Sequence, residues 1–231
     1  MLKTEYIYHS GFSVETDHKL LIFDWYKGEL PKIPEDKQIF VFVSHFHVDH
    51  YGSCIWTLPK ERTTYFLDRK VNPGFSKKKE IEKGKIKAYM LTAHKHYSID
   101  GLEIDTLFST DEGLAFSIKA DGYRIYHAGD LNIWYWDDEP MEDNRWQEGS
   151  YQKEMEYLKV SLGEEELDLA FLPLDPRLEE HAADGFLSFL KQIPCKKIYP
   201  MHYWERKDEV VNYVNQKEFV PYREKIELEF I

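Results

Sequence analysis

Three histidines and an aspartate lie within six positions of the sequence, directly after an apolar run. The segment VFVSHFHVDH, residues 41–50, contains His45, His47, Asp49 and His50. His45 and His47 are two residues apart, so on an extended loop both imidazoles lie on the same side. Neutral imidazole and carboxylate groups suit zinc above all, and a site richer in carboxylates also suits iron or manganese. The spacing predicts a metal site; the alternative is a structural cluster that holds no metal.

Two later segments each offer one further ligand. YRIYHAGDLN places Asp130 after an expected strand, where Gly129 allows the backbone to turn closely, and IYPMHYW places His202 after another. A single Gly-Asp pair is typical of a turn, and a single histidine after a strand is typical of a polar surface. In combination with HFHVDH, however, we expect both residues to join the metal site.

Short apolar and aromatic segments, separated by turn residues, predict a chain of many strands and few helices. Strands are expected over 4–9, 12–16, 19–25, 38–44, 63–68, 86–91, 102–108, 114–121, 123–130, 167–174 and 196–204, and helices over 51–58, 150–163 and 184–193. Asp121-Gly122 is a tight hairpin signal between two of the strands. A length of 231 residues without a repeat or linker predicts a single domain over residues 1–231.

Charge and composition exclude several classes of protein. The formal net charge of −12 disfavours binding to nucleic acid or to an anionic membrane, and the basic segment 76–87 alternates Lys and Glu as a solvated surface does. No run of 18 apolar residues occurs, and MLKTEYIYHS lacks the apolar block of a secretory signal. Cys54 and Cys195 form no CxxC pair. We therefore expect a cytoplasmic protein without disulfides.

The order of the motifs resembles that of the metallo-β-lactamase superfamily of metal-dependent hydrolases. HFHVDH, AGD and MH follow one another on alternating strands, and the resemblance extends from LLIFDW to YPMHYW. It implies an α/β fold, namely a four-layer αββα sandwich of the metallo-β-lactamase type with a metal cleft at one edge. The ligands it implies are His45 and His47 for a first metal, Asp49, His50 and His202 for a second, and Asp130 between them.

One position departs from the superfamily pattern. The superfamily usually supplies a third histidine to the first metal ahead of the bridging aspartate, whereas FSTDEGLAF, residues 108–116, has Ser109 there. A serine hydroxyl is a poor zinc ligand. The first metal is then weak or absent, or it recruits Asp111, a water, His94 or His96. The alternative for the HKH segment at 94–96 is a polar loop. One or two zinc ions are expected, with manganese or iron as alternatives.

Further residues are candidates for contacting substrate or for orienting a ligand. They are His9, Asp24, Ser109, Asp111, Asn132, Trp134, Asp175 and Arg177. Asp24 follows an apolar strand and is expected to orient a ligand histidine. Arg177 either grips a carboxylate or phosphate of the substrate or pairs with Asp175 as a structural latch. The segments HSGFSVE, FDW, STDEGLAF, HAGDLNIW and LPLDPR are most similar to an uncharacterised bacterial branch related to the ascorbate-phosphate lactonase group.

The chemistry of such a site favours a hydrolase acting on a small ester, lactone or phosphoester. A metal with an open position lowers the pKa of bound water from about 15.7 towards about 7. Asp49 or Asp130 is then expected to hold the water and to carry a proton to the leaving group. Two alternatives remain: a phosphodiesterase or nuclease, which the net charge disfavours, and a non-catalytic metal-binding or sensing protein whose first site was lost with Ser109. The expected partner is a small-molecule substrate, with neither nucleic acid nor membrane.

Overall fold

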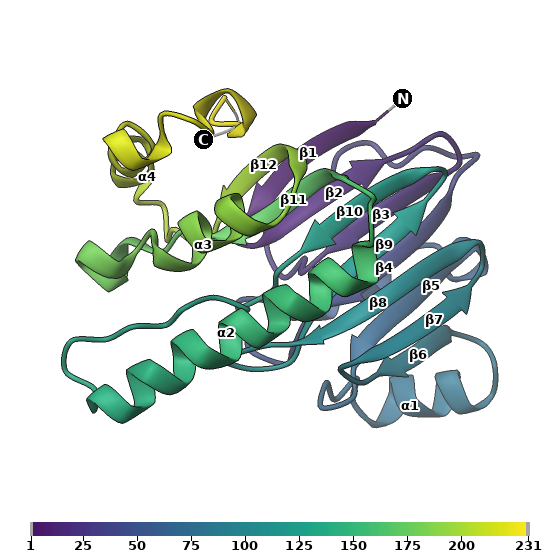
Figure 1. Cartoon of the computed structure of the whole chain (residues 1–231). Helices are drawn as coiled ribbons and strands as arrows, with labels where there is room; N and C mark the ends of the chain where they lie inside the picture. The colour runs from purple at the N-terminus through teal and green to yellow at the C-terminus, as the bar shows by residue number, and fades with distance from the viewer. Residues whose placement is uncertain (1, 230–231) are drawn as a thin grey trace.

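The chain folds into two six-stranded β-sheets that face each other (Figure 1). The computed structural model describes residues 2–229. The first sheet has the order β1-β2-β3-β4-β5-β6, with β1 Lys3–Tyr8, β2 Gly11–Glu15, β3 Lys19–Phe23, β4 Gln38–Val43, β5 Thr63–Asp68 and β6 Lys87–Leu91. The second has the order β12-β11-β10-β9-β8-β7, with β7 Lys95–Ile99, β8 Leu102–Phe108, β9 Leu114–Ala120, β10 Tyr123–His127, β11 Leu167–Pro173 and β12 Cys195–Met201.

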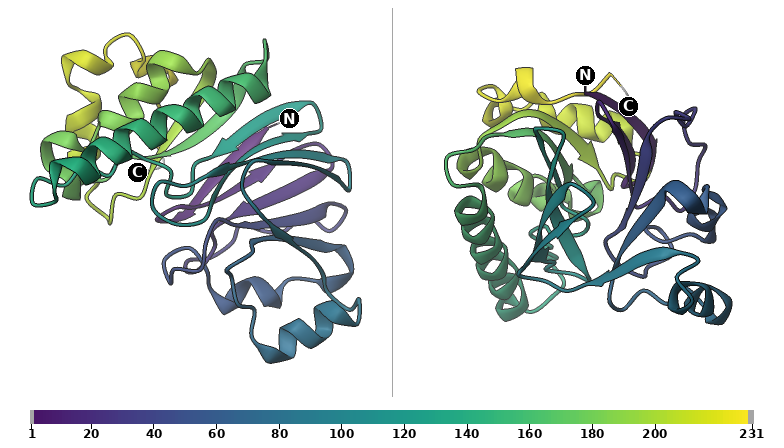
Figure 2. Two further views of the ribbon diagram at one scale, coloured as in Figure 1. Left: turned by 60° about the horizontal axis from the view of Figure 1, so that its bottom comes forward. Right: turned by 90° about the vertical axis from the view of Figure 1, so that its right-hand side faces the viewer.

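Helices cover the outer faces of the two sheets (Figure 2). Against the second sheet lie α2, Met141–Leu162, and α3, Asp184–Gln192, while α4, Lys207–Val214, follows β12. On the side of the first sheet lie α1, Phe75–Glu82, and the 3₁₀ turn η1, Ser53–Thr57. The αββα sandwich expected from the sequence is therefore confirmed. Within residues 2–229, every helix is too short or too polar to cross a bilayer.

The central strands owe their position to apolar side chains on both faces. In β4, Phe40 and Phe42 point into the core between the sheets, whereas Ile39, Val41 and Val43 pack beneath the outer helical turns. This alternation is the period-two pattern of a strand that is buried on both sides. The first sheet thus carries the apolar core on one face and a smaller cluster with Trp56 on the other.

The structure corrects three local expectations. Helix α2 begins at Met141, nine residues before the predicted start at 150, because its first turns are largely exposed and carry no apolar periodicity. Lys95 and His96, considered as part of a polar loop at 94–96, belong to β7; this edge strand pairs with β8 and leaves its polar side chains to solvent. Helix α4 was not predicted.

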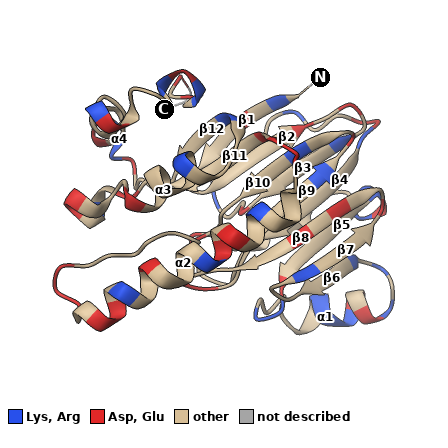
Figure 3. Cartoon of the chain, in the orientation of Figure 1, with Lys and Arg blue, Asp and Glu red and all other residues tan. Residues whose placement is uncertain are grey.

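Acidic and basic residues are interspersed along most elements, with several lysines on α1 (Figure 3).

Candidate metal centre

The candidate ligands lie on loops at the carboxyl ends of parallel strands. In the first sheet, the parallel neighbours β3 and β4 lead into Asp24 and into the HFHVDH segment. In the second sheet, the parallel strands β10, β11 and β12 lead into Asp130, Asp175 and His202. Carboxyl ends of parallel strands share one edge of a sheet, so these loops meet where the two sheets face each other.

The predicted ligands form two adjacent groups. The first consists of His45, His47 and Asp130, and the second of His9, Asp49, His50 and His202. In each group, one nitrogen or carboxylate oxygen per residue lies within 4.8 Å of those of the other members. Hence all six residues predicted as metal ligands are brought together, and His9 joins them from the turn between β1 and β2.

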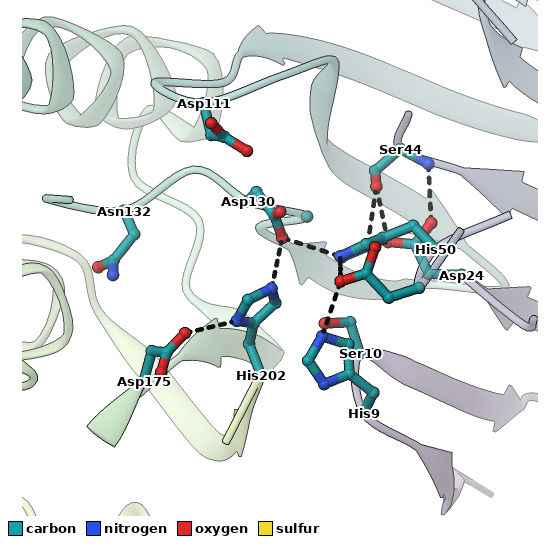
Figure 4. Close-up of polar contacts among 12 residues, drawn as sticks. His9, Ser10, Asp24, Ser44, His50, Asp111, Asp130, Asn132, Asp175 and His202 are labelled. Atoms are coloured by element: carbon teal, nitrogen blue, oxygen red, sulfur yellow. Dashed lines mark hydrogen bonds and ion pairs between the residues drawn. The ribbon is translucent and has the colours of Figure 1, made fainter. Parts of the chain in front are cut away.

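Asp130 lies between the two groups. Its Oδ1 is 3.1 Å from Nε2 of His50 and 3.5 Å from Nε2 of His202, while its Oδ2 is 3.5 Å from Nε2 of His45 (Figure 4). Trp134 donates from Nε1 to the backbone oxygen of Asp130 at 2.8 Å and so braces this loop. A single carboxylate therefore presents one oxygen to each group, as a bridging ligand does.

The atoms that face the centre are buried and lack hydrogen-bond partners. Among the described residues, this holds for Nε2 of His9, His45 and His50 and for Oδ1 of Asp130. The 3.1 Å approach between His50 and Asp130 is thus a close charge contact rather than an aligned hydrogen bond. Buried polar groups in folded proteins nearly always have a partner. A set of imidazole nitrogens and carboxylates of this kind fits zinc, iron or manganese.

Hydrogen bonds on the far side of two rings fix their tautomers. Asp24 accepts from Nδ1 of His50 at 2.8 Å, and it also accepts from the backbone N–H and the hydroxyl of Ser44, both at 2.7 Å. Because the Ser44 proton goes to Asp24, its oxygen accepts from Nδ1 of His45 at 2.9 Å. Each ring therefore turns its Nε2 towards the centre, which is the arrangement that outer partners impose on metal-binding histidines.

His202 is held in the same manner from the second sheet. Its Nδ1 lies 3.0 Å from Oδ2 of Asp175 (Figure 4). Arg177 donates from Nε to both oxygens of Asp175, at 3.0 and 2.9 Å, and its guanidinium lies over the Trp204 ring, 4.9 Å from the ring centroid. The fork of Arg177 is engaged by Asp175, which is the geometry of the latch rather than of a grip on substrate.

Burial and neighbouring charges bring several of these groups to the protonation state that metal binding needs. Burial lowers the pKa of both His9 and His45 to about 4, so each ring is neutral at neutral pH. Burial opposes the ionisation of Asp130, but His50 and His202 outweigh it and hold its pKa well below the usual value. Burial lowers the pKa of His50 as well, yet Asp130 and Asp24 raise it well above normal; a metal must displace that proton.

A cleft of about 310 Å³ opens beside the two groups. Its lining consists of His47, Asp49, Asp111, Asp130, Trp134, Trp136, Gln147, Arg177, His202 and Trp204. Trp134 was a candidate from the sequence, but Gln147 and Trp204 were missed. Asn144 fixes the wall, since its side-chain amide bonds both the N–H and the oxygen of Trp136. The cleft is thus lined by polar candidate ligands on one part of its surface and by three tryptophans on another.

Some candidates lie elsewhere. Ser109 is buried, and its Oγ accepts from the backbone N–H of Asp111 at 3.2 Å. The side chain of Asn132 lies against Gly185 and does not line the cleft. His94 and His96, considered as replacement ligands, face other partners: His94 contacts Glu154 at 2.9 Å, and His96 contacts Asp105 and Glu103, both at 2.8 Å. Neither belongs to the two groups.

Gly113 lets the loop after β8 pass directly beneath the histidine motif. Its φ is +78°, and an added Cβ would lie 2.1 Å from the oxygen of Ser44 and 2.5 Å from Cβ of His45. We expect Gly113→Ala to displace His45, to weaken metal binding and to lower the free energy of unfolding by more than the roughly 1–3 kcal/mol of backbone strain alone. Denaturant unfolding and a metal titration measure both effects.

Gly74→Ala is the matched control, because Gly74 has a φ of +80° but no atom within 4 Å of an added Cβ. It carries the backbone strain without the collision, so metal affinity is expected to stay unchanged. If Gly113→Ala and Gly74→Ala changed metal affinity and the free energy of unfolding by the same amounts, the collision with His45 would not be the cause of the weaker metal binding.

No family model matches the chain. A "UPF0173 metal-dependent hydrolase" of Paracoccus denitrificans is 24% identical over 221 residues, which cover 87% of this chain and 88% of that protein. Among solved structures, Igni18, a metallo hydrolase of Ignicoccus hospitalis, aligns with a TM-score of 0.65 at 18% identity over 98% of this chain and 94% of that one. The metallo-β-lactamase fold protein YhfI of Bacillus subtilis aligns with a TM-score of 0.57 at 12% identity, over 88% and 87% of the two chains.

These likenesses establish the metallo-β-lactamase fold and confirm the resemblance drawn from the motifs. Each of them covers at least 87% of this chain, so the shared architecture includes both sheets.

Proposed function

We propose that this protein of the metallo-β-lactamase fold is a metal-dependent hydrolase that acts on a small ester, lactone or phosphoester. The observation that carries the proposal is the convergence of unpartnered imidazole nitrogens on a shared carboxylate, beside an open cleft of about 310 Å³. The name of the Paracoccus relative, a metal-dependent hydrolase, supports the same reaction class.

The residues present fit two metal ions. His45, His47 and Asp130 would hold the first, and Asp49, His50, His202 and the other oxygen of Asp130 the second. We propose zinc, with manganese or iron as alternatives, because the donors are imidazoles and carboxylates. When bound, such a metal supplies Lewis acidity and a lowered pKa for water.

The chain's own groups bind and orient the reactants. Asp49 is partly exposed in the cleft, and its pKa lies below the usual value because contacts with His9 and His50 outweigh the effect of burial. Its ionised carboxylate can hold a water molecule and accept a proton from it. Trp134, Trp136 and Trp204 provide flat apolar faces for the non-reacting part of the substrate and exclude water from it. The cleft volume suits a small molecule.

A non-catalytic metal-binding or sensing protein is the second candidate. It is favoured by one observation: the first group contains two histidines and a carboxylate, and Ser109 occupies the position of the superfamily's usual third histidine. We also propose a cytoplasmic location for the protein, because Cys54 and Cys195 are both free thiols.

Turnover on a panel of lactones, phosphodiesters, carboxylic esters and thioesters tests the proposal. We expect at least one class to be hydrolysed by the metal-loaded protein, and we expect Asp49→Ala to lower the rate by at least about 100-fold, because a positioned acid or base contributes that much. Asp137→Ala removes an exposed carboxylate near the aromatic wall and serves as the control. A metal-replete protein that is inert on every class would favour the sensing alternative.

A further inference from the structure

His9 occupies an unusual backbone position at the edge of the second group. It lies at the turn between β1 and β2 with a φ of +57°, a backbone conformation that residues other than glycine rarely adopt. Its N–H donates to the hydroxyl of Tyr6 at 2.7 Å, and its backbone oxygen accepts from the N–H of His202 at 3.4 Å. The turn therefore holds His9 against the second sheet, although the residue belongs to the first. Strained backbone of this kind is concentrated at functional sites.

The ring of His9 has aromatic neighbours, and its Nε2 makes no hydrogen bond to the described residues. It is 3% exposed, and its centroid lies 4.2 Å from that of His202 and 4.4 Å from that of Trp204. Within the described part of the chain, its Nε2 is buried without a hydrogen bond; Oδ2 of Asp49, at 3.6 Å, is too distant for one. Packing against aromatic rings explains the position of the His9 ring. It does not explain the burial of Nε2, which is turned towards Asp49 and His50.

We propose, on the basis of the metal centre proposed above, that His9 is a further protein ligand of the second group and makes it the more tightly binding of the two groups. With His9, the second group has four residues of its own and also shares Asp130, whereas the first has only His45, His47 and Asp130. The second ion is then the tightly held one.

His9 lies on the side of the second group that faces away from the cleft. Asp49 and His202 of this group line the cleft together with His47, Asp111 and Asp130, whereas His9 and His50 are absent from its lining. In Figure 4, His9 lies on the side of His50 and His202 away from Asp111. Both groups are therefore accessible from the cleft, and His9 offers its nitrogen to the second group from the buried side.

Cobalt(II) titration of the metal-free protein tests the inference without any activity assay. For the wild type we expect two binding steps, resolved by competition with a chelator. His9→Ala and His9→Phe should each weaken the tighter step by at least about tenfold and change the visible spectrum of the complex with one cobalt ion, while the weaker step stays within about threefold of its wild-type value. His9→Phe preserves the ring contacts and removes only the nitrogen.

His18→Ala is the control, since His18 is an exposed histidine outside both groups. It should leave both binding steps unchanged. If both His9 variants bind the first cobalt ion with wild-type affinity and an unchanged spectrum, His9 is not a ligand and the inference fails alone. A wild-type protein that binds no cobalt would overturn the metal centre itself and this inference with it.

Discussion

Replacement of Asp130 by alanine is expected to remove both metal ions and to abolish hydrolysis. Its two oxygens face different groups, so the substitution deletes a ligand from each and leaves the surrounding imidazoles without their counter-charge. A bound metal contributes several kcal/mol to such a reaction, and about 1.36 kcal/mol corresponds to tenfold in rate. We expect kcat/KM to fall by at least about 1000-fold, with metal content near zero. Elemental analysis and steady-state kinetics on one preparation measure both effects.

Asp111→Ala is the matched control for this substitution. Asp111 lines the same cleft and is exposed, but it belongs to neither group of ligands. Its loss should leave both ions in place and should change the rate much less. An Asp130→Ala protein that retains two ions with wild-type affinity would show that this carboxylate does not bridge them.

Replacement of Asp24 by alanine is expected to destabilise the protein and to weaken the second metal site together. Asp24 is 1% exposed and accepts from His50 and twice from Ser44. Removal of one partner from a buried charge pair costs about 3–5 kcal/mol. Loss of a residue that orients a metal ligand typically costs about 10–100-fold in metal affinity. Urea unfolding of the metal-free protein and a separate metal titration measure the two effects.

Asp121→Ala separates stability from metal binding. Asp121 is also an anchoring carboxylate, bonded to Lys19, to the Thr16 hydroxyl and to the backbone N–H of His18, but it lies outside the metal centre. It should lower stability and leave metal affinity unchanged. If Asp24→Ala and Asp121→Ala affect metal affinity equally, the contact between Asp24 and His50 does not orient a ligand.

Much of the fold could be predicted because its signals are local. Strands β5 and β8 were placed to the residue, since each is a short apolar run with a turn at either end. Where polar surface hides the pattern, as in the first turns of α2 and in the edge strand β7, local reasoning stops early or fails. Helix α2 packs against β8 and α3, which are distant from its first turns in sequence, whereas β7 pairs with its neighbour β8 through backbone hydrogen bonds that its polar side chains do not signal.

The residues of the candidate site also differ in whether a local sequence pattern marks them. HFHVDH and Asp130 could be proposed because dense ligand spacing and strand ends are visible in the sequence. The contact of Ser44 with His45 could not be predicted, because it depends on the proton that Ser44 donates to Asp24, twenty residues earlier. Trp204 reaches the cleft through the backbone after His202, where both residues have positive φ. Such turns depend on tertiary contacts, so the sequence alone carries little sign of them.

A crystal of the zinc-loaded protein, measured at wavelengths on either side of the zinc absorption edge, tests the central claim most directly. Two anomalous peaks are predicted in each chain, one about 2.0–2.1 Å from Nε2 of His45 and from a ring nitrogen of His47 and the other at that distance from Nε2 of His50 and of His202, with Asp130 between them. A zinc-loaded crystal with no peak among these residues, or with peaks only at surface histidines, would contradict the account.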